Sequence, residues 1–339
     1  MNAENAKIQY ESGQNLVQFT ALTDSGDHQN FLSNDELWSN RSGYQPDIKP
    51  NGLATGGRVT PAASGDDDKV DVAALTCYLA GDLVTVAAQS DVTIARPTVS
   101  AYVKYSICVL ANGTLSAVKG EEGSSFSDTR GGAGGAPYIA LDAIEIAQVW
   151  LSSKSSDPIT TDEIKQVVGT HCERYDYPTW EQKRFNVEEG IIGKAGIEFD
   201  SALPLIHSAA SPVVPAPKAV YAQYYTPSFT DIPRSDAFVP AEVSHSVTSK
   251  QIYGTTLGAS TQTLGQGSFT AYLEDGISDG ILKLKNETLF FKFYQNRLNN
   301  LPYLLGQGKL GISRTFPAGD HITANCTISC EQAFAEVVG

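Results

Sequence analysis

Two short glycine-containing motifs have the spacing of loops that carry catalysis or bind cofactors. Residues 276–280 read Gly-Ile-Ser-Asp-Gly, which matches the G-x-S-x-G turn that presents a nucleophilic serine. That chemistry needs a strand before the serine and a helix after it, because the helix N-terminus supports the oxyanion. Residues 281–285 instead alternate apolar and polar side chains, as a strand does. The sequence therefore predicts a glycine-rich hairpin loop here.

The second motif, Gly-Gln-Gly-Lys-Leu-Gly at residues 306–311, matches the G-x-G-x-x-G fingerprint of dinucleotide-binding proteins. A dinucleotide site also needs a preceding strand, a following helix and an acidic residue about 20 positions on. Glu331 lies at the right distance, but a turn at residues 317–320 follows where the helix should be. We expect no nucleotide to bind at this motif.

Cysteine, histidine and acidic residues do not show the spacing of a metal site. Cys326 and Cys330 would lie about 13 Å apart on a strand, which is too far for one zinc ion. His171-Cys172 would join a metal site only if another cysteine folded nearby. The acidic pairs 121–122 and 188–189 and the run 66–68 lack the spacing of a calcium loop. We predict no catalytic, cofactor-binding or metal-ligating residues, and a protein that is not an enzyme.

Composition limits the remaining classes of function. The chain has 339 residues, of which 41% are hydrophobic and 18% charged, so most of it can form a packed core. Its formal charge of −14 repels phosphate and argues against a protein that wraps or reads nucleic acid. Residues 1–16 are polar, and no apolar run of about 18 residues is present, so we expect neither a secretory signal nor a membrane-spanning helix. Five cysteines fit synthesis in a reducing compartment.

The chain divides into three segments by composition. Residues 1–68 are polar and predict an extended, loop-rich N-terminal arm with one strand at residues 16–22. Residues 69–174 predict a β-rich accessory domain, with a hairpin at Asn112-Gly113. The spacing of Thr160 and Glu163 is that of a capping box and predicts a short helix over residues 164–168. Residues 175–339 predict a second β domain.

The third segment has the clearest strand patterns. Proline-rich residues 211–240 predict extended loops and exclude central strands. Apolar and polar residues alternate at 269–274 and 289–294. At residues 322–330, small and apolar residues share a dry face, and the opposite, wet face carries Thr323, Asn325, Thr327 and Ser329. That wet face is neutral and rich in hydroxyl groups.

Residues 248–334 resemble the tail tube proteins of long-tailed bacteriophages. The resemblance is carried by residues 265–275 (Gly-Gln-Gly-Ser-Phe-Thr-Ala-Tyr-Leu-Glu-Asp), then by strands at 288–294 and 310–316 and a closing strand at 322–334. It extends more loosely back to residue 187. The resemblance implies a tube-type β-sandwich or barrel-like domain at residues 175–339. The expected fold is therefore mainly β, with an N-terminal β-rich accessory domain.

The function implied by this resemblance is that of a structural subunit. Family members form stacked rings, six-fold in symmetry, around a channel through which DNA passes during ejection. The implied partners are other copies of the chain, and the tail sheath, baseplate and tail terminator proteins; the location is the virion tail, after synthesis in the host cytoplasm. A wall that bound phosphate would trap DNA, so the neutral face and Glu274 and Asp275 suit the lumen, whereas Lys283, Lys285 and Lys292 would not.

Two other classes of protein remain open from the sequence. A tail-fibre or receptor-binding adhesin would also be rich in strands, but it would favour trimers and clusters of exposed aromatic residues. Trp38, Trp150 and Trp180 are widely separated. Another tail or baseplate component is a further alternative. An enzyme is the weakest reading, because each catalytic motif lacks its structural context.

Overall fold

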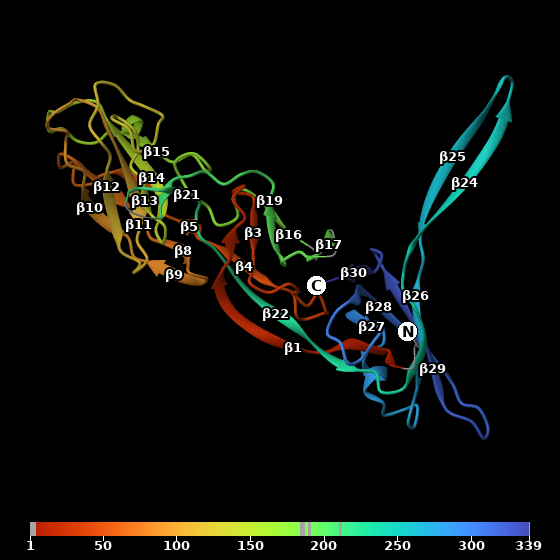
Figure 1. The fold of residues 1–339 in the computed structure, drawn as a ribbon. Coiled ribbons are helices and arrows are strands. Elements are labelled where there is room, and N and C mark those ends of the chain that lie inside the picture. The colour runs from red at the N-terminus through yellow and green to blue at the C-terminus, as the bar shows by residue number, and fades with distance from the viewer. Residues whose placement is uncertain (1–4, 184–186, 189–190, 210–211, 339) are drawn as a thin grey trace.

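Strands make up most of the protein, and the prediction of a mainly β fold is confirmed. The computed structural model describes residues 5–183, 187–188, 191–209 and 212–338. In these ranges, helical structure is confined to short 3-10 turns such as η2 (Thr161–Glu163) and η3 (Gly280–Leu284). Figure 1 shows an elongated molecule, with strands β5 to β15 gathered at one end and β26 to β29 at the other. Strands β1 and β22 run between the two ends.

The largest sheet has nine strands. Eight follow the order β23-β26-β29-β28-β27-β1-β22-β4, and β30 pairs with β28. Because β23 and β4 are its two edges, the sheet is open, and the expected closure into a barrel is not present. The strands are β1 (Lys7–Ala21), β4 (Asp47–Pro50), β22 (Val220–Asp231), β23 (Ser235–Val239), β26 (Gly267–Tyr272), β27 (Thr288–Tyr294), β28 (Tyr303–Thr315), β29 (Thr323–Cys330) and β30 (Ala335–Val337).

The N-terminal residues differ from the expected loop-rich arm. Strand β1 has 15 residues, and only its last part was expected to be a strand. It pairs with β27 through Lys7–Tyr10 and with β22 along most of its length. Polar residues interrupt the apolar pattern of β1. Backbone pairing with β22 and β27 holds it in the sheet, together with the apolar contacts of Ile8 and Val17.

Residues 52–174 fold around a hydrophobic core of their own, and we call them the accessory domain. Its core includes Leu53 and Val59, which we had predicted to lie in the N-terminal arm (residues 1–68). Three sheets surround this core, in the orders β5-β8-β9, β10-β7-β6 and β12-β11-β14-β15. The strands are β5 (Gly52–Gly56), β6 (Val59–Pro61), β7 (Lys69–Val72), β8 (Leu75–Leu79), β9 (Asp82–Val86), β10 (Gln89–Thr93), β11 (Val103–Val109), β12 (Leu115–Lys119), β14 (Ile144–Leu151) and β15 (Ile164–Lys165).

Two local predictions in the accessory domain have different outcomes. The hairpin at Asn112-Gly113 is confirmed, because it joins β11 to β12 and Gly113 has φ +77°. The capping box at Thr160 is also present: the backbone N–H of Thr160 donates to the Glu163 carboxylate at 2.8 Å. The predicted helix over residues 164–168 is wrong. Ile164 is buried and pairs with Val149 of β14, so tertiary pairing ends the helix after one turn.

Four smaller sheets complete the fold. One joins β16-β19-β3-β2 and another joins β13-β20-β21, while β17 pairs with β18 and β24 pairs with β25. These strands are β2 (Thr23–Asp24), β3 (Asn30–Leu32), β13 (Ile139–Ala140), β16 (Trp180–Lys183), β17 (Val187–Glu188), β18 (Ile191–Ile192), β19 (Gly196–Phe199), β20 (His207–Ser208), β21 (Pro215–Ala216), β24 (Val243–Ile252) and β25 (Thr255–Leu264).

The proline-rich stretch forms strands where loops were expected. Strand β22 has 12 residues and passes through Pro227. Its neighbour β4 pairs only with residues 220–223, so β22 has β1 alone as a ladder partner at Pro227. A strand edge tolerates the missing N–H of proline, which explains how β22 continues through this position.

Candidate functional site

One face of the C-terminal part of the large sheet carries hydroxyl groups at most of its outward positions. The four residues predicted for the wet face of β29 are exposed or half-buried. Neighbouring strands extend that face in register. We call the following residues the hydroxyl face: Ser268, Thr270 and Tyr272 of β26; Thr323, Asn325, Thr327 and Ser329 of β29; and Gly311, Ser313 and Thr315 of β28.

The opposite side of the same strands forms the core. Ala324, Cys326 and Ile328 of β29 are at most 1% exposed, so the predicted dry face is confirmed. They pack with Phe269 of β26 and with other apolar residues of this sheet. Because side chains alternate along a strand, the burial of one set forces the hydroxyl set outward.

Charged groups lie only at the margins of the hydroxyl face. Lys309 of β28 is exposed and pairs in register with Ser329. On the other side, Asp236 of β23 accepts a hydrogen bond from the hydroxyl of Tyr272 at 2.8 Å. Lys309 on one side, and Asp236 and Asp320 near Tyr272 on the other, therefore flank a surface that is otherwise uncharged and dense in groups that both donate and accept hydrogen bonds.

The three lysines that argued against a neutral wall lie elsewhere. Lys283 and Lys285 are exposed in and just after the 3-10 turn η3, so the expected strand over residues 281–285 is wrong. Lys292 lies on β27, and its Nζ sits 4.2 Å from the ring centroid of Phe229 and 4.9 Å from that of Tyr303. Burial lowers the pKa of Lys292. Lys283 and Lys285 lie outside the sheet. The register places Lys292 on the same side of the sheet as the hydroxyl face, but its side chain is half-buried against these rings and does not extend that face.

The G-x-S-x-G motif is a self-capped loop. The carboxylate of Asp275 accepts hydrogen bonds from the N–H groups of Ile277 and Ser278, both at 2.7 Å. The Ser278 hydroxyl also donates to Asp275, so its proton is held by a structural partner. Asp279 accepts from the backbone N–H of Glu274. Glu274 and Asp275 thus lie in a loop beyond the end of β26 and are not part of the hydroxyl face.

The G-x-G-x-x-G motif lies inside strand β28, without a following helix. A Cβ at Gly306 would lie 2.4 Å from the ring of Phe334, so this glycine makes room for an aromatic side chain. Cys326 and Cys330 are free thiols on β29. Burial raises the pKa of Cys326 to about 12 and that of Cys330 to about 11, which keeps both thiols unreactive.

Several of the other candidate ligands have structural partners. Asp68 pairs with Arg96 at 2.5 Å, and Glu122 accepts hydrogen bonds from three consecutive backbone N–H groups, residues 98–100. His171 packs edge-to-face on Trp150. The side chains of the pair 188–189 lie outside the described residues. In the described part of the chain, no three His, Cys, Asp or Glu residues converge to hold a metal ion.

Strands β24 and β25 form a long hairpin that was not predicted; we call it the arm (residues 243–264), and it is distinct from the predicted N-terminal arm. Ten residue pairs link its strands, and it projects away from the body (Figure 1). Val247 is 74% exposed and Tyr253 is fully exposed. The arm contains no acidic residue, and its strands are rich in Ser and Thr. Isolated two-stranded hairpins are marginally stable in water, so the arm gains most from a partner.

Comparison with known proteins does not assign the chain to a family. No model of a protein family matches the sequence, and no curated protein is similar to it. Among the described residues, no helix has the length and apolar character needed to cross a membrane. Function must therefore be argued from the hydroxyl face and the arm.

Proposed function

We propose that this chain is a structural subunit of a bacteriophage tail tube. Copies would close into rings, and the rings would stack around a channel through which double-stranded DNA leaves the virion. The hydroxyl face is the observation that carries the proposal, because it is a broad sheet surface with neither an apolar patch nor a cluster of charge.

A neutral, hydroxyl-rich wall suits the passage of DNA. Each phosphate that a lysine or arginine neutralises releases counterions, so a basic wall would bind the strand along its whole length. Hydroxyl and amide groups stay hydrated and hold no such charge. The acidic balance of the whole chain repels DNA over roughly 8 Å at physiological salt, which reduces binding elsewhere on the subunit.

The arm and the open sheet edges support self-association. An unpaired strand edge is a template for another chain, and closed rings of identical subunits remove such edges. The edges of the large sheet are β23 and β4, and the arm extends beyond the body (Figure 1). A second copy is a partner that is always available to these surfaces.

DNA ejection from particles tests the proposal through the charge of the face. The double variant Thr323→Lys, Thr327→Lys should slow ejection, whereas Thr323→Glu, Thr327→Glu should leave it close to the wild-type rate. The matched control is Thr76→Lys, Thr85→Lys, a cross-strand pair in the accessory domain. Equal ejection rates in all four proteins would show that the hydroxyl face does not line the channel. Trimers in place of rings would favour a tail-fibre adhesin.

A further inference from the structure

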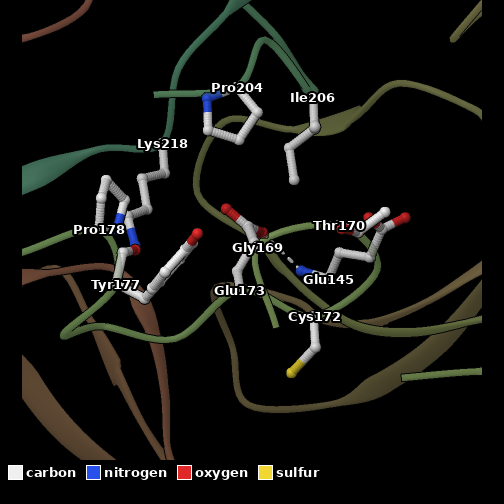
Figure 2. A pocket seen from close by; sticks show the side chains of 10 residues that line it. All are labelled: Glu145, Gly169, Thr170, Cys172, Glu173, Tyr177, Pro178, Pro204, Ile206 and Lys218. Atoms are coloured by element: carbon white, nitrogen blue, oxygen red, sulfur yellow. Dashed lines mark hydrogen bonds between the residues drawn. The ribbon is translucent and has the colours of Figure 1, made fainter. Parts of the chain in front are cut away.

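A buried ionic cluster lies where the accessory domain meets the chain that leads into β22. Residues 203–209 and 212–218, which we call the strap, connect β19 to β22. Figure 2 shows Lys218, Pro204 and Ile206 of the strap facing Glu173 and Glu145 of the accessory domain. The cavity between them measures about 30 Å³, enough for water but not for a larger ligand.

The geometry around His207 requires an extra proton. Its Nδ1 lies 2.9 Å from the carbonyl oxygen of Ala140, which only accepts, so Nδ1 must carry a proton. Its Nε2 lies 3.0 Å from Oε1 of Glu173. The other oxygen of Glu173 accepts the N–H of Glu145 at 2.7 Å. A neutral ring would therefore point a lone pair at the carboxylate, and a protonated ring donates to it.

Both members of this pair are shielded from water. His207 is 0% and Glu173 8% exposed. Other charged or titratable groups face the pair from four sides: Glu145 with its partner Arg130, Lys218 with Asp176 beyond it, and the thiols of Cys108 and Cys172. Burial raises the pKa of Cys108, and it raises that of Cys172 to about 11, so both thiols stay neutral near physiological pH.

The strap contacts the accessory domain at two places, one at His207 and one at Lys218. His207 lies in β20, which pairs in parallel with β13 (residues 139–140) of the accessory domain. At the other end of the strap, Lys218 donates hydrogen bonds to the carbonyl oxygens of Arg174 and Tyr177, where the chain leaves the accessory domain. Leu203 bonds to the backbone of His28 outside that domain. The strap thus ties the accessory domain to the rest of the molecule.

We propose that Glu173 and His207 form a proton-dependent latch that holds the strap, and with it the accessory domain, in a fixed position. With the proton present, the imidazolium joins the Ala140 carbonyl to the Glu173 carboxylate. Without it, a buried carboxylate faces a lone pair, and the strap releases. The latch depends on the accessory domain and the strap, and it does not rest on the proposed tube function.

The direction of the pH effect follows from the pKa shifts of His207 and Lys218. Burial alone would lower the pKa of His207, but the charge and hydrogen bond of Glu173 outweigh it and raise that pKa. Such a group stabilises fully below its unfolded pKa of about 6.5 and loses its contribution as pH rises through the folded value. Lys218 has the opposite effect on stability. Burial lowers its pKa to about 8, so raising the pH removes a buried charge and stabilises the folded protein. Only a local probe of the strap separates the two.

Hydrogen exchange of the backbone amides in residues 203–209 provides that probe. In the wild-type protein, protection corrected for the intrinsic rate should fall between about pH 6 and pH 10, because the strap loses its ion pair with Glu173 as His207 deprotonates. His207→Ala leaves Glu173 buried without its partner, so its strap should be poorly protected at both pH values. His321→Gln, at an exposed turn, should behave like wild type.

The variant Glu173→Gln separates a latch from simple packing. A glutamine can accept the Glu145 N–H through its oxygen and donate its NH₂ to a neutral His207, so no extra proton is needed. The strap of this variant should stay protected at both pH values. The proposal would be overturned if protection of the wild-type strap did not depend on pH. It would also be overturned if the glutamine variant showed the same pH dependence as the wild type. If Glu173→Gln fails to fold, nitrogen chemical shifts of the wild-type His207 ring decide: a neutral ring near pH 7 contradicts the latch.

Discussion

The accessory domain and the C-terminal sheet treat charge in opposite ways. The accessory domain and its strap bury Lys104, Glu145, Glu173, His207 and Lys218. Among the described residues of β23 and β26 to β29, none of the buried side chains is polar or charged, although the buried carboxylate of Glu11 on the neighbouring β1 accepts the N–H of Phe290. Buried charges need specific partners and so fix one geometry, whereas a dry core beneath an uncharged face leaves the surface free to make contacts.

This difference matches two separate roles. The ionic cluster fixes how the strap lies against the accessory domain, a task that requires directional bonds. The hydroxyl face is expected to let a polyanion pass, a task that requires the absence of clustered cations. The arm resembles the hydroxyl face in polarity, since its Ser–Thr pairs, such as Ser246 with Thr261 at 2.6 Å, satisfy hydroxyl groups without charge.

The largest effect is expected where a buried charge loses its partner. Arg130→Met leaves the carboxylate of Glu145, which is 1% exposed, without the guanidinium that lies 2.7 Å away. Breaking a buried ion pair costs about 3–5 kcal/mol in free energy of unfolding. Denaturant unfolding followed in the accessory domain measures this loss.

The matched control for this prediction is an ion pair at the surface. Arg174→Met breaks the partly exposed pair with Asp176 and should cost at most about 1 kcal/mol. Similar losses in the two variants would mean that burial does not distinguish the accessory domain's charges, and the comparison of the two regions would fail.

A packing change in the C-terminal sheet should have an intermediate effect. Gly306→Ala places a methyl group 2.4 Å from the ring of Phe334, and overpacking of this kind costs about 1–3 kcal/mol. Gly258→Ala on the arm meets no atom within 4 Å and should change the free energy of unfolding by no more than about 0.5 kcal/mol. Thermal unfolding of both variants makes the comparison, and equal melting temperatures would contradict the packing at Gly306.

The smallest effect is expected at the one half-buried lysine of β27. Lys292→Met keeps the chain length and the contact with Phe229, and it removes an ammonium whose pKa burial has lowered. When the pKa of a lysine is lower in the folded than in the unfolded protein, the free energy of unfolding rises as the pH increases from the folded pKa to the unfolded pKa. Wild-type stability should therefore rise more than that of the variant as the pH increases toward about 10. A steeper rise in the variant would contradict this assignment.

Parts of the fold could be predicted because local patterns determine them. Ala324, Cys326 and Ile328 alternate with polar residues, and this pattern alone predicts both faces of β29. The capping box of Thr160 was equally readable, but the helix after it was not, because pairing of Ile164 with β14 is a long-range contact.

The parts that the sequence did not predict depend on pairing between distant residues. The arm lacks a contrast between apolar and polar faces, so its only clear signal is the turn at Tyr253-Gly254, where glycine has φ +84°. The latch joins Glu145, Glu173 and His207 from three separate stretches of chain. No local spacing places them together, and the hydroxyl face likewise needed the register of three strands before its full extent was visible.

Electron cryomicroscopy of the concentrated protein would show both the assembly and the position of each face. We expect stacked rings with Thr323, Asn325 and Thr327 lining an open channel and the arm seated on another copy. A particle that remains a single chain, or an assembly in which these three residues are buried against protein, would contradict it.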